Sequence, residues 1–270
     1  MSEALFEARG LVVAYEGRRS AFGRRVVGKP VLHDIDIRVD RGETVGIVGE
    51  SGSGKTTLGR ALLGLVRTST GSIRFDGEEI AGLDEAAMRR LRRRMQMIFQ
   101  DPMSSLNPRR RIRGILVDPL LLHGAGGREA AELRVREVIA RVGLAPALLD
   151  RFAHQLSGGQ RQRIGIARAV ILEPEFVLAD EIVSGLDVST QAQVLALLRE
   201  LKREMNLAMA LISHDLSVVR AVCSRVYVLR QGRVVEEGPC EDVFNAPRDA
   251  YTRTLIDAVP LPVIDRTWLE

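Results

Sequence analysis

Hydrophobic and polar residues follow two different periods along this chain. Residues 31–40 alternate strictly, with Ile35, Ile37 and Val39 on one side and charged residues on the other, which predicts a half-buried strand. Elsewhere, short apolar runs predict strands, and apolar residues spaced three or four positions apart predict helices. The further strands predicted are 44–48, 95–99, 176–179, 207–212 and 226–229. One helix is predicted to begin near residue 55, and the other predicted helices are 84–94, 128–142, 161–172, 189–205 and 216–222.

The order of these elements predicts the class of fold. Strands and helices alternate on both sides of residues 101–156, which is typical of a mostly parallel sheet covered by helices. Residues 101–156 themselves contain proline loops, amphipathic helices and no obvious strand, so we expect a helical insertion there. The basic, glycine-dotted segment 16–29 is expected to be an exposed loop or hairpin tip. The residues expected to face inward on two of the helices are Leu58, Leu62 and Leu65, and Val194, Leu197, Leu198 and Leu201.

Composition and charge narrow the class of protein. The 270 residues are 46% hydrophobic and 27% charged, which suits one large folded domain or two small ones. Cys223 and Cys240 are too few for a disulfide framework or a four-cysteine zinc or iron–sulfur site, which favours a cytosolic protein. No apolar run reaches bilayer length, and the N-terminus carries acidic residues, so no secretory signal is expected. A net charge of +4 favours a mixed-charge surface over nucleic-acid binding, although arginines cluster at 89–94 and 109–113.

The segment GESGSGKT at 49–56 fits the phosphate-loop pattern G-x-x-x-x-G-K-[ST] and lies between a predicted strand and a predicted helix. Its glycines allow backbone N–H groups to converge on phosphate oxygens, and the helix N-terminus adds the positive end of its dipole. Lys55 would reach the β- and γ-phosphates of a nucleotide, and Thr56 would offer its hydroxyl to Mg²⁺. The residues expected to bind nucleotide here are Gly49, Ser51, Gly52, Ser53, Gly54, Lys55, Thr56 and Thr57.

A phosphate loop needs a carboxylate near its magnesium ion, and the run FVLADE at 176–181 offers two at the end of a predicted strand. Asp180 ends the apolar run and suits the Mg²⁺ shell. Glu181 follows it and would polarise the water that attacks the γ-phosphate. We therefore expect Asp180 in a metal site and Glu181 as a catalytic residue.

Residues 156–160, LSGGQ, precede the predicted helix 161–172 and resemble the signature of ATP-binding-cassette (ABC) ATPases. A serine hydroxyl and glycine N–H groups at a helix N-terminus suit a γ-phosphate. The helical insertion separates this segment from the phosphate loop, and in the family the signature completes the ATP site of a partner subunit. The resemblance implies that Ser157, Gly159 and Gln160 contact ATP across such a dimer.

Other elements of the same family occur in the expected order. Gln100 ends a predicted strand, as the Q-loop glutamine does, and the resemblance implies that it is both catalytic and a Mg²⁺ ligand. His214 follows a predicted strand and matches the switch histidine, implied to be catalytic. Asp187 closes SGLD, which is similar to the D-loop, and is implied to contact the nucleotide. Tyr15 matches the aromatic residue that stacks on adenine, with Phe22 as a competing candidate because the basic loop blurs the register.

Within the family the chain most resembles the oligopeptide, dipeptide and nickel importers. The run FQDPMSSLNP at 99–108 and the tail segments 243–247 and 251–255 carry this likeness. Ile182 departs from the pattern, because most relatives have proline there; isoleucine restores a backbone N–H and loosens φ. The chain also has no cysteine after Cys240, where many relatives continue into a cysteine-bearing tail, so no iron–sulfur role carries over.

The resemblance implies an α/β fold of the P-loop NTPase (RecA-like) type. Its parts would be a mostly parallel sheet, an N-terminal antiparallel β-subdomain and a helical subdomain at about 101–160, within a nucleotide-binding domain at 1–260 followed by a short tail at 261–270. The expected function is ATP binding and hydrolysis that power an importer of peptides or nickel, at the cytoplasmic face of the inner membrane. The expected cofactors are ATP and Mg²⁺.

The same resemblance implies several partners. Two transmembrane permease subunits would dock on the helical insertion, on a patch at 100–113. A second ATPase subunit, either an identical copy or a sister cassette, would complete the ATP sites. An extracytoplasmic substrate-binding protein would act indirectly, and no nucleic-acid partner is expected. Cargo choice lies with these other chains, so peptide, nickel, glutathione and opine-like cargo stay open.

Two other interpretations stay open at this point. An accessory cassette of the phosphonate-cleaving machinery would resemble this subfamily closely. A soluble cassette ATPase fits less well: translation-type members carry two cassettes in one chain, and repair-type members insert a long coiled coil, whereas only about 100 residues separate Thr56 from Leu156. The signature segment argues against a small-molecule kinase.

Overall fold

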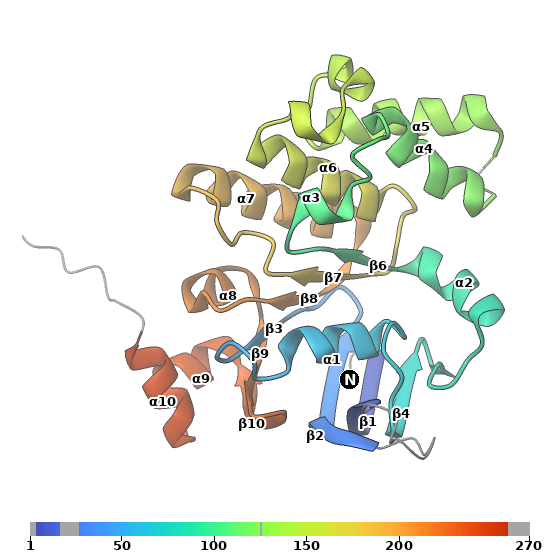
Figure 1. Cartoon of the computed structure of the whole chain (residues 1–270). Coiled ribbons are helices and arrows are strands. Elements are labelled where there is room, and N and C mark those ends of the chain that lie inside the picture. The colour runs from blue at the N-terminus through green and yellow to red at the C-terminus, as the bar shows by residue number, and fades with distance from the viewer. Residues whose placement is uncertain (1–3, 17–26, 125, 259–270) are drawn as a thin grey trace, which may run out of the picture.

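The computed structural model describes residues 4–16, 27–124 and 126–258 (Figure 1). Its N-terminal sheet is antiparallel, with strand order β2-β1-β4-β5. The alternation in β2 is confirmed, since Ile35, Ile37 and Val39 are buried. The strands of this sheet are β1 (Ala4–Glu16), β2 (Val27–Asp40), β4 (Thr70–Phe75) and β5 (Glu78–Glu79).

Strand β2 begins earlier than the alternation predicts, because it pairs with β1 as far as Glu16 opposite Val27. Residues 27–29 of the predicted basic loop therefore belong to a strand. Residues 17–26 of that loop, including the candidate Phe22, lie outside the described residues.

The second sheet has six strands in the order β10-β9-β3-β8-β7-β6. All neighbours in it pair in parallel except β9 and β10. The carboxyl ends of its parallel strands therefore meet at one edge, where ligands bind in open α/β sheets. Its strands are β3 (Thr44–Val48), β6 (Met95–Ile98), β7 (Phe176–Asp180), β8 (Ala208–Ile212), β9 (Arg225–Arg230) and β10 (Arg233–Pro239).

This six-stranded sheet separates two hydrophobic cores, because its central strands are buried on both faces. In β7, Phe176 and Leu178 belong to one core, and Val177 and Ala179 belong to the other. The first core also includes the antiparallel sheet with α1 (Lys55–Leu62) and α2 (Glu85–Arg94). The second includes α4 (Ile112–Leu122), α5 (Arg128–Arg141), α6 (Gly158–Val170), α7 (Val188–Met205), α8 (Leu216–Val222), α9 (Cys240–Asn245) and α10 (Ala250–Asp257).

Figure 1 shows this division directly: α1 lies below strands β7 and β8, whereas α6 and α7 lie above them. Between β6 and α6 the chain forms α3 (Pro102–Ser105), α4, α5 and two 3₁₀ turns, Pro146–Asp150 and Ala153–Gln155. This part is the helical insertion that the sequence predicts. In the ranges that the structure describes, no helix is long and apolar enough to cross a membrane.

The prediction for α1 is wrong at its end. Leu58 and Leu62 are buried, but the helix stops at Leu62, Gly64 takes a left-handed φ of 65°, and Leu65 is 49% exposed. The inward face of α7 is confirmed at all four predicted positions. The sequence patterns did not predict β10, α9 or α10. Strand β10 and helix α10 become important at the phosphate loop.

Candidate active site

The phosphate loop follows β3 at the carboxyl edge of the sheet, and Gly49 and Gly54 in it are sterically required. Gly49 and Gly54 take positive φ values of 146° and 107°. A Cβ at Gly49 would lie 2.1 Å from the carbonyl oxygen of Leu229, and one at Gly54 would lie 2.8 Å from Leu32 Cδ2. Only glycine fits such positions without displacing its neighbours. Gly52 also takes a positive φ, of 79°, and Ser51 beside it is exposed.

Lys55 is only 6% exposed and folds back onto this loop. Its Nζ donates to the carbonyl oxygens of Gly49 and Glu50, at 2.8 Å each. Burial lowers the pKa of Lys55, and the nearby carboxylates, that of Glu181 foremost, oppose this shift. The buried Ser53 hydroxyl has no hydrogen-bond partner among the described residues. A buried ammonium beside an unpartnered hydroxyl is a site that suits an anion such as phosphate.

Thr56, at the start of α1, contacts Asp180, at the end of β7. The Thr56 hydroxyl donates to Asp180 Oδ1 at 3.3 Å, and Asp180 is buried. Burial raises the pKa of the Asp180 carboxyl, and the Thr56 hydrogen bond partly offsets this. A hydroxyl and a carboxylate oxygen are hard ligands of the kind Mg²⁺ prefers, so this pair suits that ion.

Glu181, which follows β7, lies beside Gln100, which follows β6, and His214, which follows β8. Its φ of 48° is in the left-handed region, and its N–H donates to the carbonyl oxygen of Ile212 at 2.9 Å. Its Oε2 accepts a hydrogen bond from Gln100 Nε2 at 2.8 Å and lies 3.5 Å from His214 Nδ1. A strained backbone at a polar cluster is typical of functional sites. Ile182, which stands where relatives have proline, is buried in the second core.

Tyr15, at the end of β1, lies beside the first turn of α1. Its hydroxyl is hydrogen-bonded to Thr57 Oγ1 at 3.1 Å, and the residue is 46% exposed. Tyr15 is therefore not packed into the core, and its side chain is open to a ligand.

The signature segment forms the N-terminus of α6 and contacts the start of α7. Ser157 caps α6: its Oγ accepts from Gln160 N–H at 3.3 Å, and its own N–H donates to Gln160 Oε1 at 3.0 Å. A Cβ on Gly159 would lie 2.9 Å from Thr190 Cγ2. Asp187 caps α7 by accepting from Thr190 N–H at 2.9 Å. Within the described ranges, no hydrogen bond or ion pair joins residues 157–160 to the phosphate loop.

Sequence reasoning missed one contact of the phosphate loop. The N–H of Glu50 donates to the hydroxyl of Tyr251 in α10 at 2.9 Å, and the guanidinium of Arg230 lies 4.9 Å from the Tyr251 ring centroid. Tyr251 lies in the segment 251–255, which carries the likeness to the importer subfamily. No local sequence pattern relates Tyr251 to Glu50, because the two residues lie far apart in the sequence and meet only in the folded chain.

Fold and site together define a P-loop nucleoside triphosphatase with a second helix N-terminus suited to an anion. The family model described as ABC transporter matches residues 32–184. The chain belongs to the ABC transporter family, and within it the chain is an ATP-binding and ATP-hydrolysing cassette.

Its similarity to curated proteins covers nearly the whole chain. It is 48% identical over 258 residues to a Brucella ovis protein named "Putative peptide import ATP-binding protein", a match that covers 96% of this chain and 79% of the relative. It is 45% identical over 260 residues to the glutathione import ATP-binding protein GsiA of Pectobacterium atrosepticum, covering 96% of this chain and 42% of that protein.

Solved structures of ABC ATPase cassettes are also similar to this chain. The ATP-binding cassette MJ0796, in a dimeric post-hydrolysis state bound to ADP and Pi, matches with a TM-score of 0.76 and 27% identity, over 87% of this chain and 98% of that one. The cbiO1 protein of Clostridium perfringens, part of the ABC transporter complex cbiONQ, matches with a TM-score of 0.75 and 27% identity, over 90% and 92% of the two chains.

The buried charge of Asp180 yields a stability prediction. Because burial raises its pKa in the fold, the folded state binds this proton more tightly than the unfolded state, so ionisation destabilises the fold as the pH rises above the unfolded pKa. Asp180→Asn keeps an acceptor for Thr56 and should raise the Tm of the nucleotide-free protein at neutral pH by about 3 °C, roughly what 1 kcal/mol produces in a domain of this size.

Calorimetry across pH checks this prediction. The advantage of the Asn variant should shrink as the pH falls and Asp180 takes up its proton. Asp187→Asn is the control, because the hydrogen bond from Thr190 lowers the pKa of that exposed capping carboxyl and its replacement should not stabilise. An advantage for Asp180→Asn that grew toward acid pH would contradict the account.

Proposed function

We propose that this chain is the ATP-hydrolysing subunit of a peptide importer, acting at the cytoplasmic face of the inner membrane. The observation that carries the proposal is the Glu181 cluster, which lies at the same sheet edge as the phosphate loop. The names of the relatives favour peptides or glutathione as cargo, and favour import over the phosphonate and soluble alternatives.

In this proposal the phosphate loop, from Gly49 to Thr57, binds the ATP phosphates. Lys55, held by the carbonyl oxygens of Gly49 and Glu50, neutralises phosphate charge, and Ser53 gains the partner that its hydroxyl lacks. Tyr15 lies at the exposed edge of this loop and offers its ring to adenine.

Magnesium is the second proposed cofactor. Thr56, Asp180 and the amide oxygen of Gln100 would hold it, and it would neutralise charge on the β- and γ-phosphates. Glu181 accepts the proton of the attacking water. His214 and Gln100 orient the Glu181 carboxylate through the contacts described above.

A second ATPase subunit, identical or a sister cassette, completes each site. The apolar face of α1 belongs to one core and that of α6 to the other, so the signature helix lies on the opposite face of the sheet from the phosphate-loop helix. Ser157, Gly159 and Gln160 are thus available to the γ-phosphate held by a partner, with Asp187 beside them.

Two permease subunits dock beside the segment at 100–113, and an extracytoplasmic binding protein supplies cargo to them. A groove of about 540 Å³ lies between the end of α1, β6 and the helical insertion. Leu65 and Phe99 line it and are exposed, and the guanidinium of Arg168 lies 5.4 Å from the Phe99 ring centroid. Exposed apolar side chains in a groove next to Gln100 suit a short permease helix.

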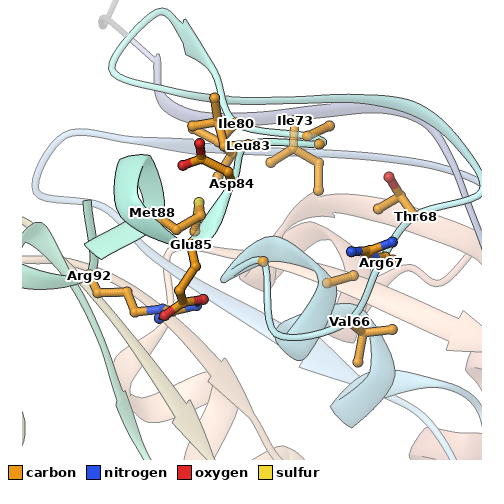
Figure 2. A pocket seen from close by; sticks show the side chains of 14 residues that line it. Val66, Arg67, Thr68, Ile73, Ile80, Leu83, Asp84, Glu85, Met88 and Arg92 are labelled. Atoms are coloured by element: carbon orange, nitrogen blue, oxygen red, sulfur yellow. Dashed lines mark hydrogen bonds and ion pairs between the residues drawn. The ribbon is translucent and has the colours of Figure 1, made fainter. Parts of the chain in front are cut away.

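A neighbouring hollow of about 500 Å³ extends this surface. It lies between the end of α1, β4 and α2, and Ile80, Leu83 and Met88 line it (Figure 2). Arg92 borders both hollows and is ion-paired with Glu85.

We also propose limits for the domains of the chain. The nucleotide-binding domain spans 1–260, its helical subdomain spans about 101–160, and a short tail follows at 261–270.

The catalytic role of Glu181 predicts a separation of binding from turnover. Glu181→Gln keeps the phosphate loop intact but removes the carboxylate that accepts the proton, so kcat should fall at least about a hundredfold while ATP affinity stays. Steady-state ATPase assays and an equilibrium titration with labelled ATP measure the two quantities. Glu237→Gln, on the exposed side of β10, is the matched control and should keep wild-type turnover. Turnover of the Glu181 variant within threefold of wild type would contradict the assignment.

The groove predicts a loss of coupling on Leu65→Glu. A charge at this exposed position should leave the fold and basal ATPase intact but weaken permease binding. The measurements are recovery of the tagged chain with membranes and uptake of a labelled oligopeptide by the cells. Both should drop severalfold. Leu133→Glu is the control, since Leu133 is 59% exposed on α5 and outside the groove. Equal behaviour of the two variants would contradict the proposal that a permease subunit binds in the groove. Nickel uptake is measured in the same cells, and its loss with normal peptide uptake would contradict peptide as the cargo.

A further inference from the structure

The phosphate loop is held from outside by the C-terminal part of the chain. The N–H of Glu50 donates to the Tyr251 hydroxyl at 2.9 Å, and the N–H of Gly232, in the turn between β9 and β10, donates to the Ser53 carbonyl at 2.9 Å. These two bonds anchor both ends of the stretch Glu50–Ser53. Arg230 and Tyr251 line a small hollow of about 160 Å³ against it.

Tyr251 is itself fixed in place. It is 6% exposed, and the Arg230 guanidinium covers its ring. The start of α10 is tied to β10, because Glu236 accepts hydrogen bonds from the N–H groups of Arg248 and Asp249 at 2.8 and 3.1 Å. The phenol therefore offers its hydroxyl to Glu50 from a rigid base.

The bond to Tyr251 controls one peptide plane. The Gly49 carbonyl and the Glu50 N–H belong to the same peptide unit, and in a trans peptide they point in opposite directions. The N–H is held outward by Tyr251, and the carbonyl accepts from Lys55 Nζ at 2.8 Å. Glycine on one side leaves this plane free to rotate at little cost, so an external partner is needed to fix it.

We propose that Tyr251 is a positioning residue for ATP binding: its hydroxyl fixes the Gly49–Glu50 peptide plane and thereby places the Lys55 ammonium. Helix α10 thus becomes part of the nucleotide site without contacting the nucleotide. The inference rests on the phosphate loop being the ATP site, as proposed above.

Tyr251→Phe tests this in the full chain. Removing one neutral hydrogen bond should raise both the Kd for ATP and the KM about fivefold. The value of kcat should stay within twofold, because the loop holds the phosphates equally in the ground state and the transition state. Equilibrium titration with labelled ATP and steady-state ATPase assays give the three quantities. Glu236→Gln, which weakens the base of α10, should shift the Kd in the same direction by less.

Tyr227→Phe is the matched control. Tyr227 is also buried, and its hydroxyl bonds to the backbone N–H and carbonyl of Arg38, both at 3.1 Å, away from the phosphate loop. Both substitutions should lower the Tm, but only the change at Tyr251 should shift the Kd for ATP. An unchanged Kd, or equal shifts for the two tyrosines, would overturn the positioning role.

Lys55→Ala, measured in the same titration, separates the two proposals. If it loses ATP binding while Tyr251→Phe binds normally, the phosphate-loop site stands and the inference falls. If Lys55→Ala binds ATP normally, the site assignment is wrong and the inference falls with it.

Discussion

The six-stranded sheet holds apart the two helices whose N-termini suit phosphate, and the proposed mechanism depends on that separation. Each strand in its centre sends alternate side chains into opposite cores, so α1 packs on one face and α6 on the other. The N-terminus of α6 cannot move through the sheet to the phosphate loop of its own chain, because that would disrupt both close-packed cores. On this account one chain carries half of each of two ATP sites, and hydrolysis requires a partner.

At the carboxyl edge, groups are buried before any ligand satisfies them. Among the described residues, the buried Lys55 donates only to carbonyl oxygens, the Ser53 hydroxyl has no partner, and the Asp180 carboxyl is buried. Glu181 holds a left-handed backbone. Such a site lowers the stability of the empty protein, and ligand binding recovers it. Polar groups held in this way need no reorganisation when ATP enters.

Local patterns in the sequence predicted most of the residues that meet at this candidate site. The glycine spacing at 49–56 and the acids at 180 and 181 each follow a strand, and parallel strands bring such ends together whatever lies between them. The end of α1 was not predictable from apolar spacing alone: Leu65 keeps the helical period, but Gly64 takes a left-handed φ and ends the helix, which leaves Leu65 exposed. Tyr251 could not be related to the loop, because its contact is tertiary and depends on β10, a strand that the pattern did not predict.

The central claim is that the signature of one chain acts on the phosphate loop of another, and mixing two inactive variants measures it most directly. Ser157→Arg blocks the signature, and Lys55→Ala disables the phosphate loop. When the partner is an identical copy, a mixed dimer has one site with both defects and one site with neither. Equal mixing should restore about a quarter of the wild-type ATPase rate, since about half of the dimers are mixed and one of their two sites is complete. No recovery in a mixture whose chains are shown to exchange would contradict the account.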